Sequence, residues 1–308
     1  MAVILGLLLV VTFIANYLTT TLPNTMGQND LQHNVLVENQ VAQLGAVVQD
    51  TAEADVVGAQ VSQPVTLGSA GAPPFAAQDR ATITPLANQS LLTVHFNITN
   101  PTSGKVVPIT SSTRNTSCGT AFCTGTGFVV HLLNTYASSA EVAYEQGAVV
   151  YAQPSSIPVF VVPPSITYTC VAQCNQAGMQ GVLSLFVPQF SNRVSTEAGA
   201  GTAELSLRLL SAVPFAFPVT GFSLTSGQQV TVTVTTPYAA TWYSYLQAYF
   251  QSFTTLSAQV SCAPTGSTSP CTALYEPGGP LGTVTLSVPV AGVSALDLLV
   301  GFYSFALA

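Results

Sequence analysis

Six cysteines are the residues of this 308-residue chain whose spacing most directly suggests chemistry. They fall as three close pairs: Cys118 and Cys123 in CGTAFC, Cys170 and Cys174 in CVAQC, and Cys262 and Cys271 in CAPTGSTSPC. Many pairings are formally open, but separations this short make the local partner the simplest choice. A zinc site would need two-residue gaps and nearby histidines, and His33, His95 and His131 lie near none of the pairs. We therefore expect three local disulfides. They imply an oxidising, extracytoplasmic location or, alternatively, a hyperthermophilic host, whose intracellular proteins can also carry disulfides.

A second candidate for chemistry is the carboxylate pair Glu141 and Glu145 in EVAYE. In an extended strand both side chains point to the same side, and two carboxylates can divide the acid and base roles of a glycosidase. A solvated strand face is the more common explanation of such a pair. His95 in LTVHFNI and His131 in FVVHLL lie among apolar strand residues, which is typical of histidines that serve the sheet.

No established catalytic motif accompanies these residues. The sequence contains no HExxH, GxSxG, P-loop or nucleotide-binding glycine pattern, and no DxDxDG loop for calcium. We predict no catalytic residue, no cofactor and no metal.

The composition points to a surface that is hydrated without charge. Hydrophobic residues make up 48% of the chain and charged residues 6%, with a net charge of −7. Such a chain has no basic patch for phosphates, so we predict no nucleic-acid partner. Thr, Ser, Gln and Asn must cover the surface, and sugar would add to them, since Asn88, Asn97 and Asn115 each begin an N-x-[ST] sequon. We expect at least one of these asparagines to carry a glycan.

The elements that position these residues begin with an uncharged apolar segment, MAVILGLLLVVTFIANYL, at residues 1–18. It lacks the basic flank and the cleavage site of a secretory signal, and its length is close to the ~20 apolar residues that span a bilayer. It is either an anchor that stays or the end exposed by an earlier cleavage. We expect the second, with Met1 as the first mature residue after removal of a basic leader.

A helical pattern continues behind this segment to about residue 57. Val37, Val41, Leu44 and Val48 form an apolar stripe that needs a partner. We predict one rod over 1–57, kinked or melted at LPNTMG by Pro23 and Gly27. The acidic residues at its end, Asp50, Glu53 and Asp55, are either solvated or met by an arginine of a neighbouring subunit.

Beyond Gly58 the apolar pattern changes to a period of two. More than ten short β-branched or aromatic runs alternate with turn residues, which predicts an α+β fold: a long N-terminal hydrophobic helix followed by a mostly antiparallel β-sandwich domain at 58–308. Pro214 and Pro218 mark a possible division into two sub-domains near 214–220. One further helix is expected over 238–253, where Trp242, Leu246, Tyr249 and Phe253 form a stripe that packs against the sheet.

The first sixty residues resemble archaeal type IV pilin-like proteins, the superfamily of archaellins and adhesion pilins. The segments that carry the likeness are MAVILGLLLVVTFIANYLTTTLPN and NVLVENQVAQLGAVVQDT, followed by a Thr/Val-rich β region. Bacterial pilins usually carry Glu at the fifth mature position, and Leu5 stands here, so the resemblance is to the archaeal branch. In that family a prepilin peptidase removes a short basic leader and leaves the apolar segment as the mature N-terminus.

The resemblance implies a structural subunit of an extracellular, cell-surface filament that sits in the membrane before assembly. Its partners would be identical subunits, the prepilin peptidase and the assembly machinery. The expected assembly residues lie on one helix: Leu5, Leu9, Phe13, Val37, Val41, Leu44 and Val48. The alternatives are a singly anchored adhesive surface protein that does not polymerise, and an anchored enzyme.

Overall fold

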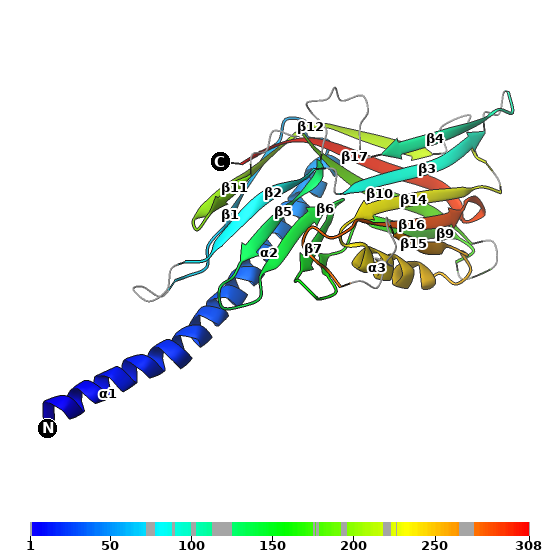
Figure 1. The fold of residues 1–308 in the computed structure, drawn as a ribbon. Helices are drawn as coiled ribbons and strands as arrows, with labels where there is room; N and C mark the ends of the chain where they lie inside the picture. Colours follow the sequence, from blue (N-terminus) through cyan, green and yellow to red (C-terminus); the bar gives the residue numbers. More distant parts are fainter. Residues whose placement is uncertain are drawn as a thin grey trace.

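The computed structural model describes most of the chain, and the following account concerns only that part. It covers residues 2–71, 78–87, 90–99, 103–112, 125–174, 176, 179–191, 196–217, 223–225, 227–264 and 274–307. Figure 1 shows the N-terminal helix (blue) projecting away from a strand-rich domain, with the N-terminus at its free end. The predicted α+β fold, a long apolar helix followed by mostly antiparallel sheets, is confirmed.

The long helix consists of three consecutive helical segments. α1 spans Ala2–Asn16, a π-helical turn spans Tyr17–Thr21, and α2 spans Leu22–Glu53. The backbone N–H of Leu22 donates to the carbonyl of Tyr17, five residues back, which is the hydrogen bond of a π-helix. Pro23 follows at once and has no N–H to give, so the wider turn fits its ring into a continuous helix. Of the two alternatives expected at LPNTMG, a kink or a melted turn, the melted turn is wrong: residues 22–27 are α-helical, and the irregularity is the π turn just before them.

The strands form two sheets. The first, sheet A, contains eleven strands: β1 (Gln60–Thr66), β2 (Arg80–Ala87), β5 (Gly125–Leu133), β6 (Ala140–Glu145), β7 (Ala148–Ala152), β8 (Val159–Val162), β9 (Ile166–Ala172), β10 (Gln180–Ser191), β11 (Glu197–Gly199), β12 (Thr202–Phe217) and β17 (Val293–Leu307). The second, sheet C, contains six: β3 (Leu91–Thr99), β4 (Val106–Ser112), β13 (Ser223–Leu224), β14 (Gln229–Thr236), β15 (Gln259–Pro264) and β16 (Gly282–Pro289). Among the described strands only β10 and β17 pair in parallel.

Sheet A is covered on both faces, which creates two apolar cores. One lies between α2 and sheet A, and the other between sheet A, sheet C and helix α3 (Ala239–Gln251). Because side chains alternate along a strand, Leu185 of β10 belongs to the second core and its neighbour Phe186 to the first. β6 is buried along its whole length for the same reason. The described domain is thus built of three layers: helix, sheet A, and sheet C with α3 (Figure 1).

Helix α3 packs as its sequence pattern predicts. Trp242 and Leu246 are fully buried in the core beneath sheet C, and Tyr249 and Phe253 pack partly buried against the same core. The α3 helix contacts β14, β15 and β16. Its apolar stripe therefore has a packing role.

The region of the proposed sub-domain division contains a continuous strand where it is described. β12 runs through Pro214, which pairs with Leu299 of β17. Pro218 and the rest of 218–222 lie outside the described residues. The division near 214–220 remains a prediction.

Candidate functional site

The first twenty residues of the helix expose apolar side chains on every side. Leu5, Leu9 and Phe13, three of the expected assembly residues, are all exposed, Phe13 to 72%. Among the described residues this helix alone is long and apolar enough to cross a membrane, and its most apolar stretch buries nothing within the chain. Exposure to water costs about 25 cal/mol for each Å² of such surface. The segment is therefore compatible with insertion into a membrane, as predicted.

The apolar stripe of α2 has its partner inside the same chain. Val37, Val41, Leu44 and Val48 are all 0% exposed and share one core with strands of sheet A. The prediction that these four residues contact another subunit is wrong. It treated the helix as a rod standing clear of the β domain, whereas sheet A lies along α2 and supplies the partner that the stripe needs.

Close packing and polar contacts fix α2 on the sheet. A Cβ atom built on Gly45 would lie 2.9 Å from Cε2 of Tyr144, so glycine allows the helix to approach the ring. The Tyr303 hydroxyl donates to the Val48 carbonyl. Gln40 exchanges two hydrogen bonds with Thr66 of β1, at 3.2 Å from its Nε2 to Oγ1 and 3.0 Å from the Thr66 N–H to its Oε1. The part of α2 from Val37 to Val48 is therefore packed as an element of the β domain.

The opposite side of α2 is exposed and also carries large apolar residues. We call Leu31, Val35, Leu36 and Val47 the outer face of α2; all four are exposed, Val35 to 56%. Sequence reasoning missed this face because it followed the single best heptad stripe. The signal was present in a second apolar set: Leu31, Val35 and Leu36 come just before that stripe in the sequence, and Val47 lies within it. Nothing in the described chain covers this face. Exposed polar residues between positions 19 and 28 separate it from the apolar side chains of α1.

The acidic end of the helix faces solvent. α2 ends at Glu53, four residues earlier than predicted, and Asp55 follows in the left-handed conformation with φ of 49°. Asp50, Glu53 and Asp55 are exposed, and Glu53 accepts a hydrogen bond of 2.7 Å from Nε2 of Gln49. Within the chain these carboxylates are solvated; contact with an arginine of a neighbouring subunit remains a prediction.

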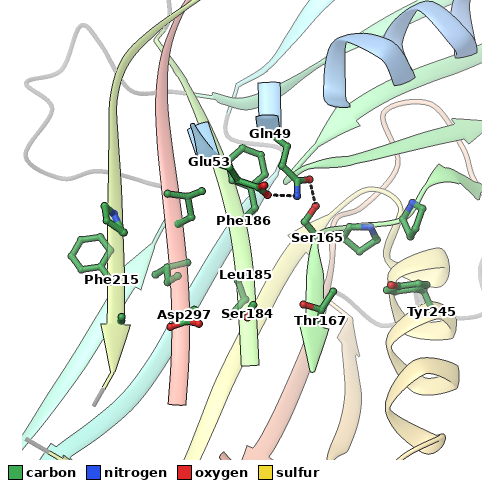
Figure 2. Close-up of a pocket in the computed structure, with 16 residues that line it drawn as sticks. Gln49, Glu53, Ser165, Thr167, Ser184, Leu185, Phe186, Phe215, Tyr245 and Asp297 are labelled. Atoms are coloured by element: carbon green, nitrogen blue, oxygen red, sulfur yellow. Dashed lines mark hydrogen bonds between the residues drawn. The ribbon is translucent and has the colours of Figure 1, made fainter. Parts of the chain in front are cut away.

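An open groove of about 480 Å³ begins where α2 ends. Figure 2 shows Gln49 and Glu53 at one end of it, Phe215 on β12 and Asp297 on β17 along one side, and Tyr245 of α3 on the other. The Ser165 hydroxyl donates to Oε1 of Gln49 at 2.6 Å and so closes the groove against the helix. The floor is the part of sheet A that α2 leaves uncovered.

The predicted disulfides are confirmed where they can be followed. Cys170 and Cys174 are joined at the end of β9, and Cys262 in β15 is also disulfide-bonded. The expected partner Cys271 and the pair Cys118 and Cys123 lie outside the described residues.

Of the three sequons, one lies in the described chain. Asn97 is half-buried in β3, and its amide nitrogen donates to Oε1 of Gln228 at 3.2 Å. Asn88 and Asn115 lie outside the described residues. Glycosylation of any of the three remains a prediction.

The carboxylate pair is buried, which overturns its interpretation as a solvated strand face. Oε1 of Glu141 lies 2.9 Å from Nδ1 of His131, and Tyr238 and Tyr275 donate to its other oxygen. Burial raises the pKa of Glu141, but the hydrogen bonds from His131 and the two tyrosines outweigh it, so the pKa lies below its ordinary value. Nε2 of His131 is 2.9 Å from the Thr84 hydroxyl, so this histidine serves the sheet, as predicted. His95 is exposed on β3, and Nε2 of His33 lies 2.8 Å from the Thr66 carbonyl.

Glu145, four residues further along the same strand, occupies a different environment. It is wholly buried; Nε1 of Trp242 donates to it, and the Thr236 hydroxyl lies 2.8 and 2.9 Å from its two oxygens. Burial raises its pKa to about 7 despite these hydrogen bonds. Glu141 and His131 line a small pocket of about 300 Å³ that Glu145 does not reach. The pocket at Glu141 is therefore not one in which the two carboxylates could share acid and base roles.

Replacing Glu145 with glutamine should raise stability at neutral and alkaline pH. The folded pKa of about 7 exceeds the ordinary value of 4.5, so the contribution of the protonated acid is complete below about pH 4.5 and is lost as the pH rises through 7. Glutamine keeps the acceptor for Trp242 and never ionises. At pH 4 the two chains should differ little in stability. From pH 4 to pH 8 the free energy of unfolding of Glu145→Gln should rise relative to that of the natural chain by about 3 kcal/mol, measured by urea unfolding at both pH values. Glu276 is exposed, so the stability of Glu276→Gln should depend on pH as that of the natural chain does. The same pH dependence in Glu145→Gln as in the natural chain would contradict a raised pKa at Glu145.

Comparison with known proteins adds no relative. No protein-family model matches the chain, and no curated protein matches it significantly. A solved structure, the ywiB protein from Bacillus subtilis, aligns over 68% of this chain and 92% of its own, with 9% identity and a TM-score of 0.10. At that TM-score the likeness carries no argument about fold or function.

Proposed function

We propose that this chain is a structural subunit of an extracellular, type IV pilus-like filament. It would sit in the membrane through α1 before assembly and polymerise with identical copies through the apolar surface of the helix. The observation that carries the proposal is that exposed apolar side chains occur along α1 and again on the outer face of α2, while the other side of α2 is buried in its own domain.

The extent of this surface favours polymerisation over a single anchor. A lone membrane anchor needs apolar residues only over the bilayer, which about 20 residues span. Val35 and Val47 lie well beyond that length, at the level of the β domain, and are exposed. Outside a bilayer, identical helices are the natural cover for such a surface, and a repeated contact that does not close on itself produces a helical filament.

In the proposed filament the helices form the inside and the β domain the outside. The face of the domain that packs on α2 would then point inward, and sheet C would face the surroundings. The disulfide at Cys170 and Cys174 and the hydroxyl-rich strands suit an extracytoplasmic surface with a role in adhesion. A prepilin peptidase and an assembly machinery would act on the chain before polymerisation.

The proposal is tested on cell-surface material removed by mechanical shearing. Filaments seen by electron microscopy should contain this chain as a major protein, identified by peptide mass spectrometry, and an antibody to the β domain should label them along their length. Retention of the chain in the membrane fraction after shearing, with no labelled filament, would favour the anchored surface protein instead.

A further inference from the structure

The groove at the end of α2 lies on the face of sheet A to which that helix is packed. Phe186 of its floor belongs to the core between α2 and sheet A, and Leu299 packs against that core. α2 ends at Glu53, whereas the strands beneath it extend further. Figure 2 shows the strands of the floor running on from Gln49 and Glu53 toward Asp297. The groove is therefore the continuation of a helix–sheet interface beyond the end of its helix.

A row of apolar side chains crosses the floor of the groove. Pro214 of β12 pairs with Leu299 of β17, and Leu299 pairs with Phe186 of β10, so the three lie side by side on one face. We call them the apolar row. Pro214 is exposed and Leu299 is half-buried, so part of the row faces the open groove. Apolar side chains grouped in this way in a groove are typical of a contact site for another apolar element.

The charges around the apolar row narrow the chemistry of its partner. The described residues that line the groove include no Lys, Arg or His, and they include two carboxylates, Glu53 and Asp297. Both carboxylates are exposed and border the row on opposite sides, toward the end of α2 and away from it (Figure 2). A phosphate, an acidic sugar or an acidic peptide would therefore be repelled. The partner that fits the row is apolar and carries no negative charge.

α1 has the complementary property. It contains no charged side chain, and its apolar side chains are exposed in the single chain. A helix that is apolar on every side is stable only when it is surrounded, in a bilayer or in protein. In the proposed filament, neighbouring helices cover the sides of α1 that face the interior, and the inward faces of the β domains must cover the rest. The groove lies on that inward face, and Val47 of the outer face of α2 is only two residues from Gln49, which lines it.

We propose that the groove receives α1 of a second copy of this chain, an inference that rests on the proposed filament. Apolar side chains of α1 would lie on the apolar row, and Glu53 and Asp297 would stay at the rim in contact with water. Neighbouring subunits would then be joined by a contact between helix and sheet in addition to contacts between helices. It would be the same kind of contact that fixes α2 on its own sheet.

The test places a photoreactive residue in the groove of the assembled filament. Ala216 of β12 is exposed and pairs with Asp297, so its side chain lies on the groove face. With p-benzoylphenylalanine in place of Ala216, irradiated filaments should yield a cross-link to residues 2–16 of another copy, identified by mass spectrometry on mixed isotope-labelled subunits. The same photoreactive residue in place of Val106, on sheet C, should give no cross-link to that segment.

The outcomes separate this inference from the proposed function. Filaments that form but give cross-links from the groove only to other parts of the chain, to a different molecule or to nothing overturn this inference alone. A natural chain that forms no filament overturns the proposed function and this inference with it.

Filling the groove gives a second, independent readout. Ala216→Trp places a large side chain beside the apolar row from an exposed position, so the melting temperature should stay close to that of the natural chain. A helix then has no room on the row, and we expect at least about 10-fold fewer filaments, as for an overpacked contact. Val106→Trp, at a position 47% exposed on sheet C, is the control and should assemble as the natural chain does. If Ala216→Trp lowers the melting temperature, Thr167→Trp, at an exposed position of β9 in the same groove, replaces it. Normal assembly of a folded groove-filling variant would overturn the proposal.

Discussion

Replacing Val35 with glutamate should abolish filament formation and leave the domain folded. Val35 lies on the outer face of α2 and is 56% exposed, so a carboxylate there is solvated in the single subunit. In the proposed filament the same position is covered by a neighbouring helix, and burial of an unpaired carboxylate costs several kcal/mol at every repeated contact. We expect no filaments by electron microscopy of sheared material and an unchanged melting curve for the purified subunit.

A matched control separates the helix contact from a general effect of charge. Val106 on β4 is also a valine, is 47% exposed and lies in sheet C, the layer that does not pack on α2. Val106→Glu should therefore assemble as the natural chain does. Normal filaments from Val35→Glu subunits would contradict the proposed function, because the outer face would then have no role in assembly.

Replacing Val41 with glutamate should unfold the domain itself. Val41 is 0% exposed in the core between α2 and sheet A, only six residues from Val35 but on the other side of the helix. A glutamate there would bury its carboxylate among apolar side chains, and we expect the free energy of unfolding to fall by about 4 kcal/mol or more. Thermal unfolding of the full chain in detergent, followed by circular dichroism in the sheet region, measures the loss.

The control for this experiment lies on the same helix. Val47→Glu introduces the same change at an exposed position of the outer face, next to the buried Val48. Its melting temperature should stay close to that of the natural chain, although its assembly should be impaired like that of Val35→Glu. Equal stability of Val41→Glu and the natural chain would show that α2 does not depend on sheet A for its packing.

Periodicity in the sequence was enough to predict the class of fold. Strictly alternating runs such as QVTVTVTT coincide with β14, and the stripe of Trp242 and Leu246 predicted the packing of α3. The hairpin of β6 and β7 was not predicted; its two-residue turn is Gln146 and Gly147, which both have positive φ angles. These elements are specified locally, by the alternation of residues and by turn chemistry.

Three of the longer strands, β1, β2 and β4, fall outside the predicted alternating runs, and each contains proline. β1 includes Pro64, β2 includes Pro85 and β4 includes Pro108. Proline argues against a central strand, but it is tolerated at edges and irregularities: β1 and β4 each pair with one strand, and the register of β2 shifts beside Pro85. The edges of a sheet are set by topology, which no local pattern reveals.

The site was harder to predict than the fold for a related reason. The stripe at Val37 to Val48 was correctly identified as buried, but its partner is sheet A, contributed by strands far away in sequence. The burial of Glu141 and Glu145 likewise depends on tyrosines and a tryptophan about a hundred residues downstream.

The outer side of sheet C has a consequence for how the protein meets its surroundings. Thr93, Thr233, Thr285 and Ser261 follow one another across four adjacent strands, and the Thr235 and Thr283 hydroxyls on the same side lie 3.3 Å apart. Hydroxyl groups bind water but do not titrate at any ordinary pH, and they attract no counterions. Two such rows of hydroxyl groups neither repel nor attract one another through charge, so they contribute to the approach of two faces through hydration and not through salt-screened charge.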